Sequence, residues 1–258
     1  MPRRLTLALA LACLAPAAWA DFRAEYVGDA AAASAAPLLS RIEVGGDHMR
    51  TDAGKVSMLF DVGNGKMIIL MHDKKEWMDM GKVAETASAA MAQANAALAN
   101  LPPEQRAMIE QRMKGAMGAA GAKLDVRVTP TGAADRVGSW PCQVYRTDVG
   151  DRHVDDSCLA DVGAAGISGA DRATVQRAFE QMKAMADKMT NGMFKSPISQ
   201  LPQGKFPVKI THYDDAGKSQ VVTLKEIDTG SVSAADFAVP PGYAEKTPEV
   251  PGPPGRRH

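Results

Sequence analysis

The cysteine-bearing segment Gly138–Ala160 constrains the fold of this chain most strongly. It alternates apolar and polar residues on either side of Gly150, a residue suited to a φ > 0 position, and so predicts a β-hairpin with a three-residue loop. In that register Cys142 lies directly opposite Cys158, and we expect a disulfide between them. In the chain-entropy view, closing a loop of this size stabilises the fold by about 3 kcal/mol. The alternative is a pair of reduced, buried thiols.

Residues 1–20 have the composition of a secretory signal peptide. Two arginines precede an apolar run, and an A-x-A motif ends at Ala20, directly before Asp21. The apolar run is too short for a transmembrane helix. We therefore expect export to the periplasm or beyond, cleavage after Ala20, and an oxidising compartment that favours the disulfide. The alternative is a lipoprotein acylated at Cys13.

The region from Asp21 to Met80 alternates short β-type runs with Gly, Asn and Asp, which is typical of antiparallel strands joined by tight turns. The expected strands are Phe22–Val27, Leu39–Val44, His48–Thr51, Val56–Asp61, Lys66–His72 and Glu76–Met80.

Asn64-Gly65 is the strongest hairpin signal in this region. A two-residue turn there pairs Phe60 with Ile69, and an even-length turn after the next strand keeps the following methionines on the same side. The residues predicted to share this apolar face, and to contact a ligand, are Met58, Phe60, Met67, Ile69, Met71, Met78 and Met80. The opposite face is mixed, and we expect it to be partly solvated; it carries Ser57, Leu59, Asp61, Leu70, His72, Trp77 and Asp79.

The rest of the chain predicts two kinds of helix and three further strands outside the cysteine hairpin. An Ala-rich helical insertion over residues 83–118, interrupted at Pro102 and Pro103, is a candidate lid. A clearer amphipathic helix is expected over Asp171–Thr190, lying across the sheet. The other expected strands are Lys123–Pro130, Phe206–Tyr213 and Gln220–Ile227. Residues 21–243 form a single domain in this interpretation, and the Pro- and Gly-rich residues 244–258 form a disordered tail.

Composition excludes some classes of partner. Lys plus Arg and Asp plus Glu number 30 each, so no basic stripe favours nucleic acid. Aromatic residues are few and methionines number 15, so flexible thioethers must supply much of the interior. Enzyme signatures such as H-E-x-x-H, G-x-S-x-G and the P-loop do not occur, so we predict no catalytic residue, no cofactor and no enzymatic activity.

Three short motifs resemble a known family: G-D-H-M-R at 46–50, G-S-W-P-C-Q-V-Y at 138–145 and F-A-V-P-P-G-Y at 237–243. Together they resemble an uncharacterised bacterial exported domain of unknown function, which is similar to the LolA/LolB-like periplasmic lipoprotein carriers. The resemblance covers about residues 22–243. It implies an α+β fold, an incomplete antiparallel β-barrel or half-barrel with helices covering a concave face that accommodates acyl chains. Arg50 matches a recurrent arginine of the family, for which a structural role is expected. The chain differs from the carriers in that Asp21 leads directly into a strand.

We therefore expect an exported protein that binds an apolar ligand, an acyl chain, lipid or lipoprotein, in a methionine-rich cleft, with possible peripheral association with envelope components. One alternative is an envelope-stress or structural interaction module without a ligand. Another is Cu(I) binding by the methionines around Trp77, because thioethers are soft ligands. No other metal site is predicted.

Overall fold

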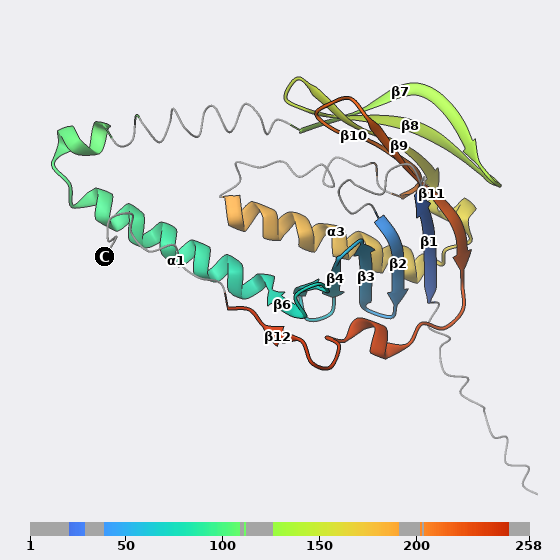
Figure 1. Ribbon diagram of the computed structural model, residues 1–258, viewed down its shortest axis with the longest axis horizontal. Coiled ribbons are helices and arrows are strands. Elements are labelled where there is room, and N and C mark those ends of the chain that lie inside the picture. The colour runs from blue at the N-terminus through green and yellow to red at the C-terminus, as the bar shows by residue number, and fades with distance from the viewer. Residues whose placement is uncertain are drawn as a thin grey trace, which may run out of the picture.

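A computed structural model describes residues 21–28, 39–108, 111, 126–190, 202 and 204–247, excluding the side chains of residues 91, 94 and 186–190. The predicted signal peptide, Cys13 and residues 248–258 lie outside the described residues. Twelve strands in the described ranges form one open sheet in the order β12-β6-β5-β4-β3-β2-β1-β11-β10-β9-β8-β7 (Figure 1). Neighbouring strands are antiparallel except β12 and β6, which are parallel.

Most strand bounds follow the predicted alternation of runs and turns. The exception is the strand predicted over residues 123–130: residues 123–125 lie outside the described ranges, and β7 continues seven residues past Pro130, to Val137. The first six strands are β1 Phe22–Gly28, β2 Leu39–Gly45, β3 His48–Ala53, β4 Val56–Asp61, β5 Lys66–Met71 and β6 Glu76–Asp79. The others are β7 Val126–Val137, β8 Trp140–Val149, β9 Arg152–Asp161, β10 Lys205–Tyr213, β11 Ser219–Asp228 and β12 Ala244–Glu245. The ordered chain thus extends past the predicted domain end at residue 243, because β12 pairs with β6.

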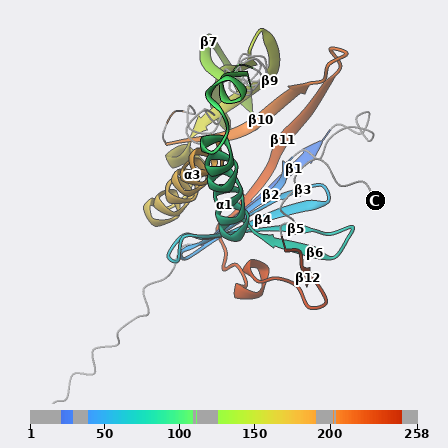
Figure 2. The ribbon, with the colours of Figure 1, turned by 90° about the vertical axis from the view of Figure 1, so that its left-hand side faces the viewer.

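Two helices lie on one side of the sheet and contact each other (Figure 2). α1, Met80–Ala99, begins earlier than the predicted insertion because Asp79 caps it, accepting from the backbone N–H groups of Gly81 and Lys82. Residues 103–108 are helical again after the break at the two prolines, as predicted. The second helix, α3, spans Gly169–Thr190.

The N-terminus of α3 is fixed by paired hydrogen bonds. The hydroxyl of Ser168 donates to the carboxylate of Asp171 and accepts from the Asp171 backbone N–H. One turn later, Thr174 donates to the carbonyl of Gly46, in the turn between β2 and β3. These bonds fix the start of α3, which runs across the strands and contacts β2 and β3 (Figure 1).

The hairpin between β4 and β5 has a longer turn than predicted. Phe60 pairs with Met67, not with Ile69, so the turn has four residues. A two-residue type I′ turn needs positive φ at both central residues, and here Gly65 has it (66°) whereas Asn64 does not. Asn64 is instead held by Asp61, which accepts from both its backbone and its side-chain N–H groups. Between β5 and β6, the even-length turn predicts that Met78 lies beside Met71, but Met78 pairs with Ile69. This is again a shift of two residues.

A shift of two residues leaves every side chain on its predicted face, since strand side chains alternate with a period of two. Met58, Ile69 and Met78 therefore share one face, as expected. Met80 is the exception, because it begins α1 and does not extend β6.

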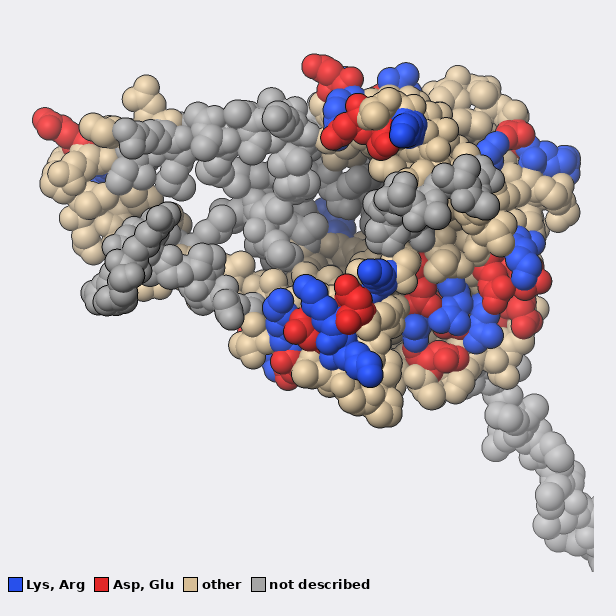
Figure 3. Space-filling model, in the orientation of Figure 1, with Lys and Arg blue, Asp and Glu red and all other residues tan. Residues whose placement is uncertain are grey.

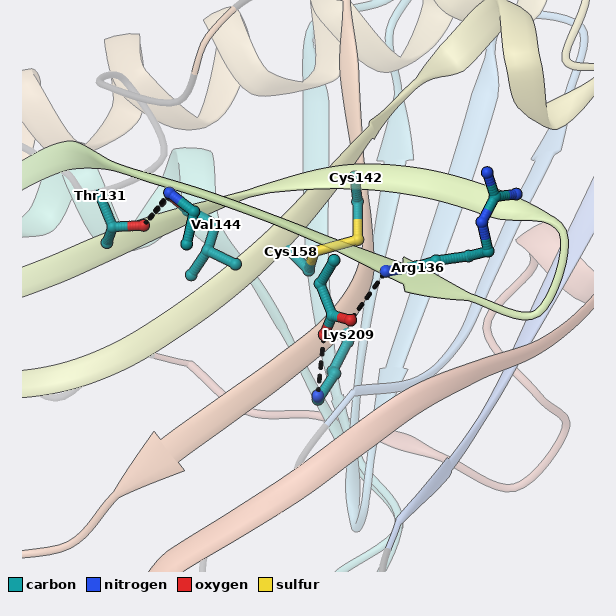
Figure 4. The surroundings of a disulfide bond; sticks show 8 residues. Thr131, Arg136, Cys142, Val144, Cys158 and Lys209 are labelled. Carbon is teal, nitrogen blue, oxygen red and sulfur yellow. Dashed lines mark hydrogen bonds and ion pairs between the residues drawn. A yellow bond between two sulfur atoms is a disulfide. The ribbon is translucent and has the colours of Figure 1, made fainter.

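The predicted disulfide is confirmed, but its predicted register is wrong. Cys142 and Cys158 are bonded, with their Cα atoms 5.4 Å apart, and they join β8 to β9 (Figure 4). Cys142 pairs with Ala160 and Cys158 with Val144, so the bond runs diagonally across the ladder. The hairpin turn is tighter than expected, and a β-bulge near Thr147 adds a residue to β9. Both cysteines lie in the main hydrophobic core.

Candidate functional site

The face of β1–β6 that meets the helices, here called the helix face, carries two neighbouring rows of apolar side chains. The first row crosses five strands, each residue paired with the next, and none of its members is more than 7% exposed. It consists of Phe22, Val44, Met49, Phe60 and Met67. This row is filled core.

The second row lies beside the first and becomes progressively less buried toward β6. Its members, again paired across successive strands, are Ala24, Ile42, Thr51, Met58, Ile69 and Met78. Ala24 and Ile42 are buried, whereas Met58, Ile69 and Met78 are half-buried. Met71, further along β5, is half-buried as well. The helix face is therefore closed at one row and partly open at the next.

These rows divide the predicted ligand contacts into two groups. Phe60 and Met67 are packed in the core and do not offer a free surface. Met58, Ile69, Met71 and Met78 retain partly exposed apolar side chains on the helix face. Met80 also stays half-buried, but it packs from the first residue of α1.

The helices over this face have small residues at their most buried contacts with the sheet and larger ones beside them. α1 buries Ala84 against β5 and β6, and beyond residue 90 its described side chains are exposed except for a half-buried Leu98. α3 buries Ala178 and places partly buried Val175, Phe179, Met182 and Met185 against the core. Small residues at the closest points of contact leave the methionines of β4–β6 incompletely covered.

The register places no two of the methionines that a copper site would use directly opposite each other, although Met71 is diagonal to both Met58 and Met78. Ile69 lies between Met58 and Met78 in the second row, so these two methionines are not paired. Met71 is diagonal to Met78, and such positions are about 7–8 Å apart at Cα. Within the described ranges, no group of three or more His, Cys, Asp or Glu side chains could hold a metal ion.

The opposite face of β1–β6, here called the strap face, was predicted to be partly solvated, and its members Asp61, His72, Trp77 and Asp79 are half-buried. Its centre is more buried than predicted. Leu59 is 4% exposed, and Leu70 and Ser57 are 0% exposed. The reason is the C-terminal strap, residues 229–247, which contains the short helix η4, Ala234–Phe237, and ends in β12. Its residues pack on β3 and pair with β6.

Phe237 anchors the strap at the start of β3. Its ring stacks on His48 with the ring centroids 5.6 Å apart, and it approaches Gly45 so closely that a Cβ there would lie 2.8 Å from the ring. Only glycine fits that position without moving the ring. Beside it, a recess of about 220 Å³ is lined by Leu59, Ile68, Val239 and other residues of the strap and of β3–β5, including Asp61, Lys66 and Phe60.

A continuous hydrogen-bond chain lies beneath the far end of the strap. The Tyr243 hydroxyl is 2.7 Å from Nδ1 of His72, and Nε2 of His72 is 2.6 Å from the hydroxyl of Ser57. Ser57 is 2.5 Å from the carboxylate of Asp52, which can only accept. Ser57 therefore donates to Asp52, His72 donates through Nε2, and Tyr243 donates to Nδ1. Because Ser57 is buried and its proton points to a carboxylate, this serine–histidine contact is not an activated nucleophile.

Ion pairs complete the polar layer of the strap face. Burial alone raises the pKa of Asp52, but hydrogen bonds from Ser57, Arg50 and Arg41 hold this pKa below its ordinary value. Arg50 also donates to the carbonyl of Asp236 in the strap, at 2.8 Å. Arg50 therefore ties the strap to β3, which is a structural role of the kind that the family resemblance implied. A second ion pair joins Arg23 to fully buried Glu43 at 2.5 Å.

Sequence reasoning missed that two of the three family-like motifs meet on this face. His48 and Arg50 belong to the first motif, and Phe237 and Tyr243 bound the last one. No local periodicity links segments so distant in the chain. An unusual density of Gly, Pro and aromatic residues in 237–243 was the available signal.

These observations define the class of the protein: a mostly β chain with one large open sheet, helices on one face and a C-terminal strap on the other. None of the helices in the described ranges combines the length and the apolar character that a membrane crossing requires. Residues 103–243 match DUF4412, a domain of unknown function, and the chain belongs to this family. Strands β1–β6 precede the matched region. A search of curated proteins found no match.

Proposed function

We propose that this chain is an exported, non-enzymatic binding protein for the acyl chain of a lipid or lipoprotein. The ligand chain lies along the open part of the helix face, over Met58, Ile69, Met71 and Met78. The observation that carries the proposal is the change from buried to half-buried residues along the second row, which leaves the apolar carbon of Met58, Ile69 and Met78 partly exposed. Partly covered apolar surface of this kind is typical of ligand grooves.

In this proposal the curved sheet functions as a half-barrel of the LolA/LolB-like kind, with α1 and α3 covering its concave face. Methionine suits the task because its thioether side chain adapts to ligands of different shape. The α1 helix, held near its first turns and largely exposed beyond them, acts as the movable cover. Peripheral association with the envelope follows from the nature of the ligand.

The direct test is recovery of the full-length protein from its native envelope, followed by mass spectrometry of the intact protein and of organic extracts. We expect a mature chain that begins at Asp21, one intact disulfide, and bound acyl lipid or lipoprotein in a defined ratio. A diacylglyceryl group on Cys13 would instead show that the chain is processed as a lipoprotein and is not cleaved after Ala20. Protein purified without any acyl molecule, and unable to take one up in vitro, would contradict the proposal and favour a structural interaction module.

Copper binding is separated from acyl binding by Met71→Leu and Met78→Leu, which keep the apolar volume and remove sulfur. We expect the double variant to retain lipid binding. Stoichiometric Cu(I) uptake in competition with a chelator, lost in this variant, would instead support the copper alternative.

A further inference from the structure

Thr51 is the one polar residue in the second row of the helix face. It pairs with Ile42 on one side and with Met58 on the other. Its side chain is 9% exposed, and its hydroxyl oxygen is buried without a hydrogen-bond partner among the described residues. Buried hydroxyl groups are ordinarily hydrogen-bonded, because an unpartnered one loses its contacts with water and regains none. Thr51 therefore has a hydrogen-bonding capacity that no described residue satisfies.

Gln181 presents a second unpartnered group from the other side. Both polar atoms of its carboxamide are buried, and neither has a hydrogen-bond partner in the described part of the chain. Gln181 continues the stripe of α3 that contains buried Thr174 and Ala178, following them at intervals of three and four residues. Since Thr174 bonds to Gly46, that stripe faces β2 and β3. The hydroxyl of Thr51 thus lies on the sheet, and the carboxamide of Gln181 lies on the stripe of α3 that faces β2 and β3. Both groups are buried, and Thr51 belongs to the buried part of the second row.

The chemistry of these two groups limits what they can bind. A hydroxyl and a carboxamide offer hydrogen-bond donors and acceptors but no charge. An ionised carboxylate or phosphate buried between apolar residues without a countercharge is strongly disfavoured. An ester or amide group supplies a neutral carbonyl acceptor, and can be desolvated at much lower cost.

We propose that Thr51 and Gln181 form a polar subsite that hydrogen-bonds the uncharged ester or amide group joining the ligand's acyl chain to the remainder of the molecule. The subsite rests on the proposed function, since the acyl chain itself lies on Met58, Ile69 and Met78. The protein then selects acyl esters and amides over free fatty acid anions. It does so without any charged residue in the row.

The test uses displacement of a fluorescent apolar probe, 1-N-phenylnaphthylamine, from the mature chain. Competitors of equal chain length are methyl laurate, lauramide and laurate at pH 8. We expect the ester and the amide to compete about tenfold more tightly than the anion. In the variant Thr51→Val with Gln181→Met, which keeps side-chain size, affinity for the ester and amide falls about tenfold whereas affinity for the probe stays within about twofold.

Two results overturn the subsite and are distinguishable from failure of the proposed function. If the wild-type chain does not bind the probe, the acyl-binding function fails and the subsite with it. If the probe binds but the double variant retains the full preference for ester and amide, only the subsite is wrong. A ligand-free readout is the midpoint of thermal unfolding, which we expect to rise or stay unchanged in both single variants. A fall in both would mean that the two groups already have partners within the protein.

Discussion

The two faces of β1–β6 differ in composition and are closed in different ways: the helix face is almost entirely apolar, whereas the strap face combines apolar residues with ion pairs and a hydrogen-bond chain. On the strap face, the chain covers its own sheet with residues 229–247 and ties that cover down through Arg50 and Tyr243. On the helix face, α3 closes one row completely and leaves the next row half-buried. What sets the helix face apart as a candidate binding face is a continuous apolar row that is left half-buried, without charged residues in it.

The two apolar rows of the helix face contain no charged residue, whereas Arg23, Glu43, Arg50 and Asp52 lie on the strap face. Lys and Arg are interspersed with Asp and Glu over the surface visible in Figure 3. On the strap face the charges are mostly paired, as in the contacts of Asp52 with Arg50 and Arg41. The faces therefore differ in polarity as well as in packing, and substitutions can test the difference in packing directly.

The largest expected effects come from the buried positions of both faces. Phe60→Ala on the helix face should lower the free energy of unfolding by about 3–5 kcal/mol, and Leu70→Ala on the strap face by about 2–5 kcal/mol. Met58→Ala should lower it clearly less, because that side chain is already half-exposed. Chemical denaturation gives all three values. A loss at Met58 as large as at Phe60 would mean that the second row is closed core.

Loss of the disulfide ranks next. The double variant Cys142→Ala with Cys158→Ala should be less stable by about 2–5 kcal/mol, since it loses both the cross-link and buried sulfur. Reduction of the wild-type protein provides the matched control, and the two should lose similar stability. Unchanged stability in both would show that the β8–β9 pairing holds the core without the bond.

The Cys142–Cys158 bond also shows how far the sequence can predict the fold. Alternating runs identified nearly every strand, and two cysteines in one hairpin identified the bond. The register could not be read, because a β-bulge near Thr147 and the longer turn at Asn64 depend on backbone angles that residue type only biases. Because each register shift equals two residues, the helix face was still assembled correctly from the sequence.

The strap face shows where sequence reasoning failed. Leu59 and Leu70 were expected to be partly solvated because their face mixes apolar and polar residues, but both are buried. Their cover comes from the far end of the chain, where Phe237 reaches Gly45. Long-range closure of this kind leaves no local periodicity. The change from buried to half-buried residues along the second row could not be read from the sequence either. It depends on where Ala84 and Ala178 of the two helices meet the sheet.

A smaller effect is expected where the strap meets the hydrogen-bond chain. Tyr243→Phe removes one hydroxyl and leaves Nδ1 of His72 without its partner, at a cost of about 1–3 kcal/mol. Amide hydrogen exchange, compared between Tyr243→Phe and wild type, should show acceleration in β12 and the strap and little change in β8 and β9. Uniform acceleration throughout the sheet would mean that the strap is part of the global folding unit.

The pH dependence of the strap face provides the finest test. The lowered pKa of Asp52 means that its contribution to stability is fully present above the ordinary carboxyl value of about 3.9. This contribution is lost as the pH falls through the lowered pKa of the folded state. The stability difference between wild type and Asp52→Asn should therefore be largest above about pH 5 and shrink in acid. A difference independent of pH would show that the carboxylate's charge does not stabilise the strap.

The most direct test of the proposed binding face compares two adjacent isoleucines of β5. Ile69 belongs to the second row of the helix face, whereas Ile68 lines the recess on the strap face, and both are half-buried. Ile69→Gln and Ile68→Gln introduce the same polar group on opposite faces, and circular dichroism confirms that both variants are folded. Titration with 1-N-phenylnaphthylamine should show about tenfold weaker binding for Ile69→Gln and a change within about twofold for Ile68→Gln. Equal affinities in the two variants, or a loss confined to Ile68→Gln, would contradict the assignment of the helix face as the ligand-binding surface.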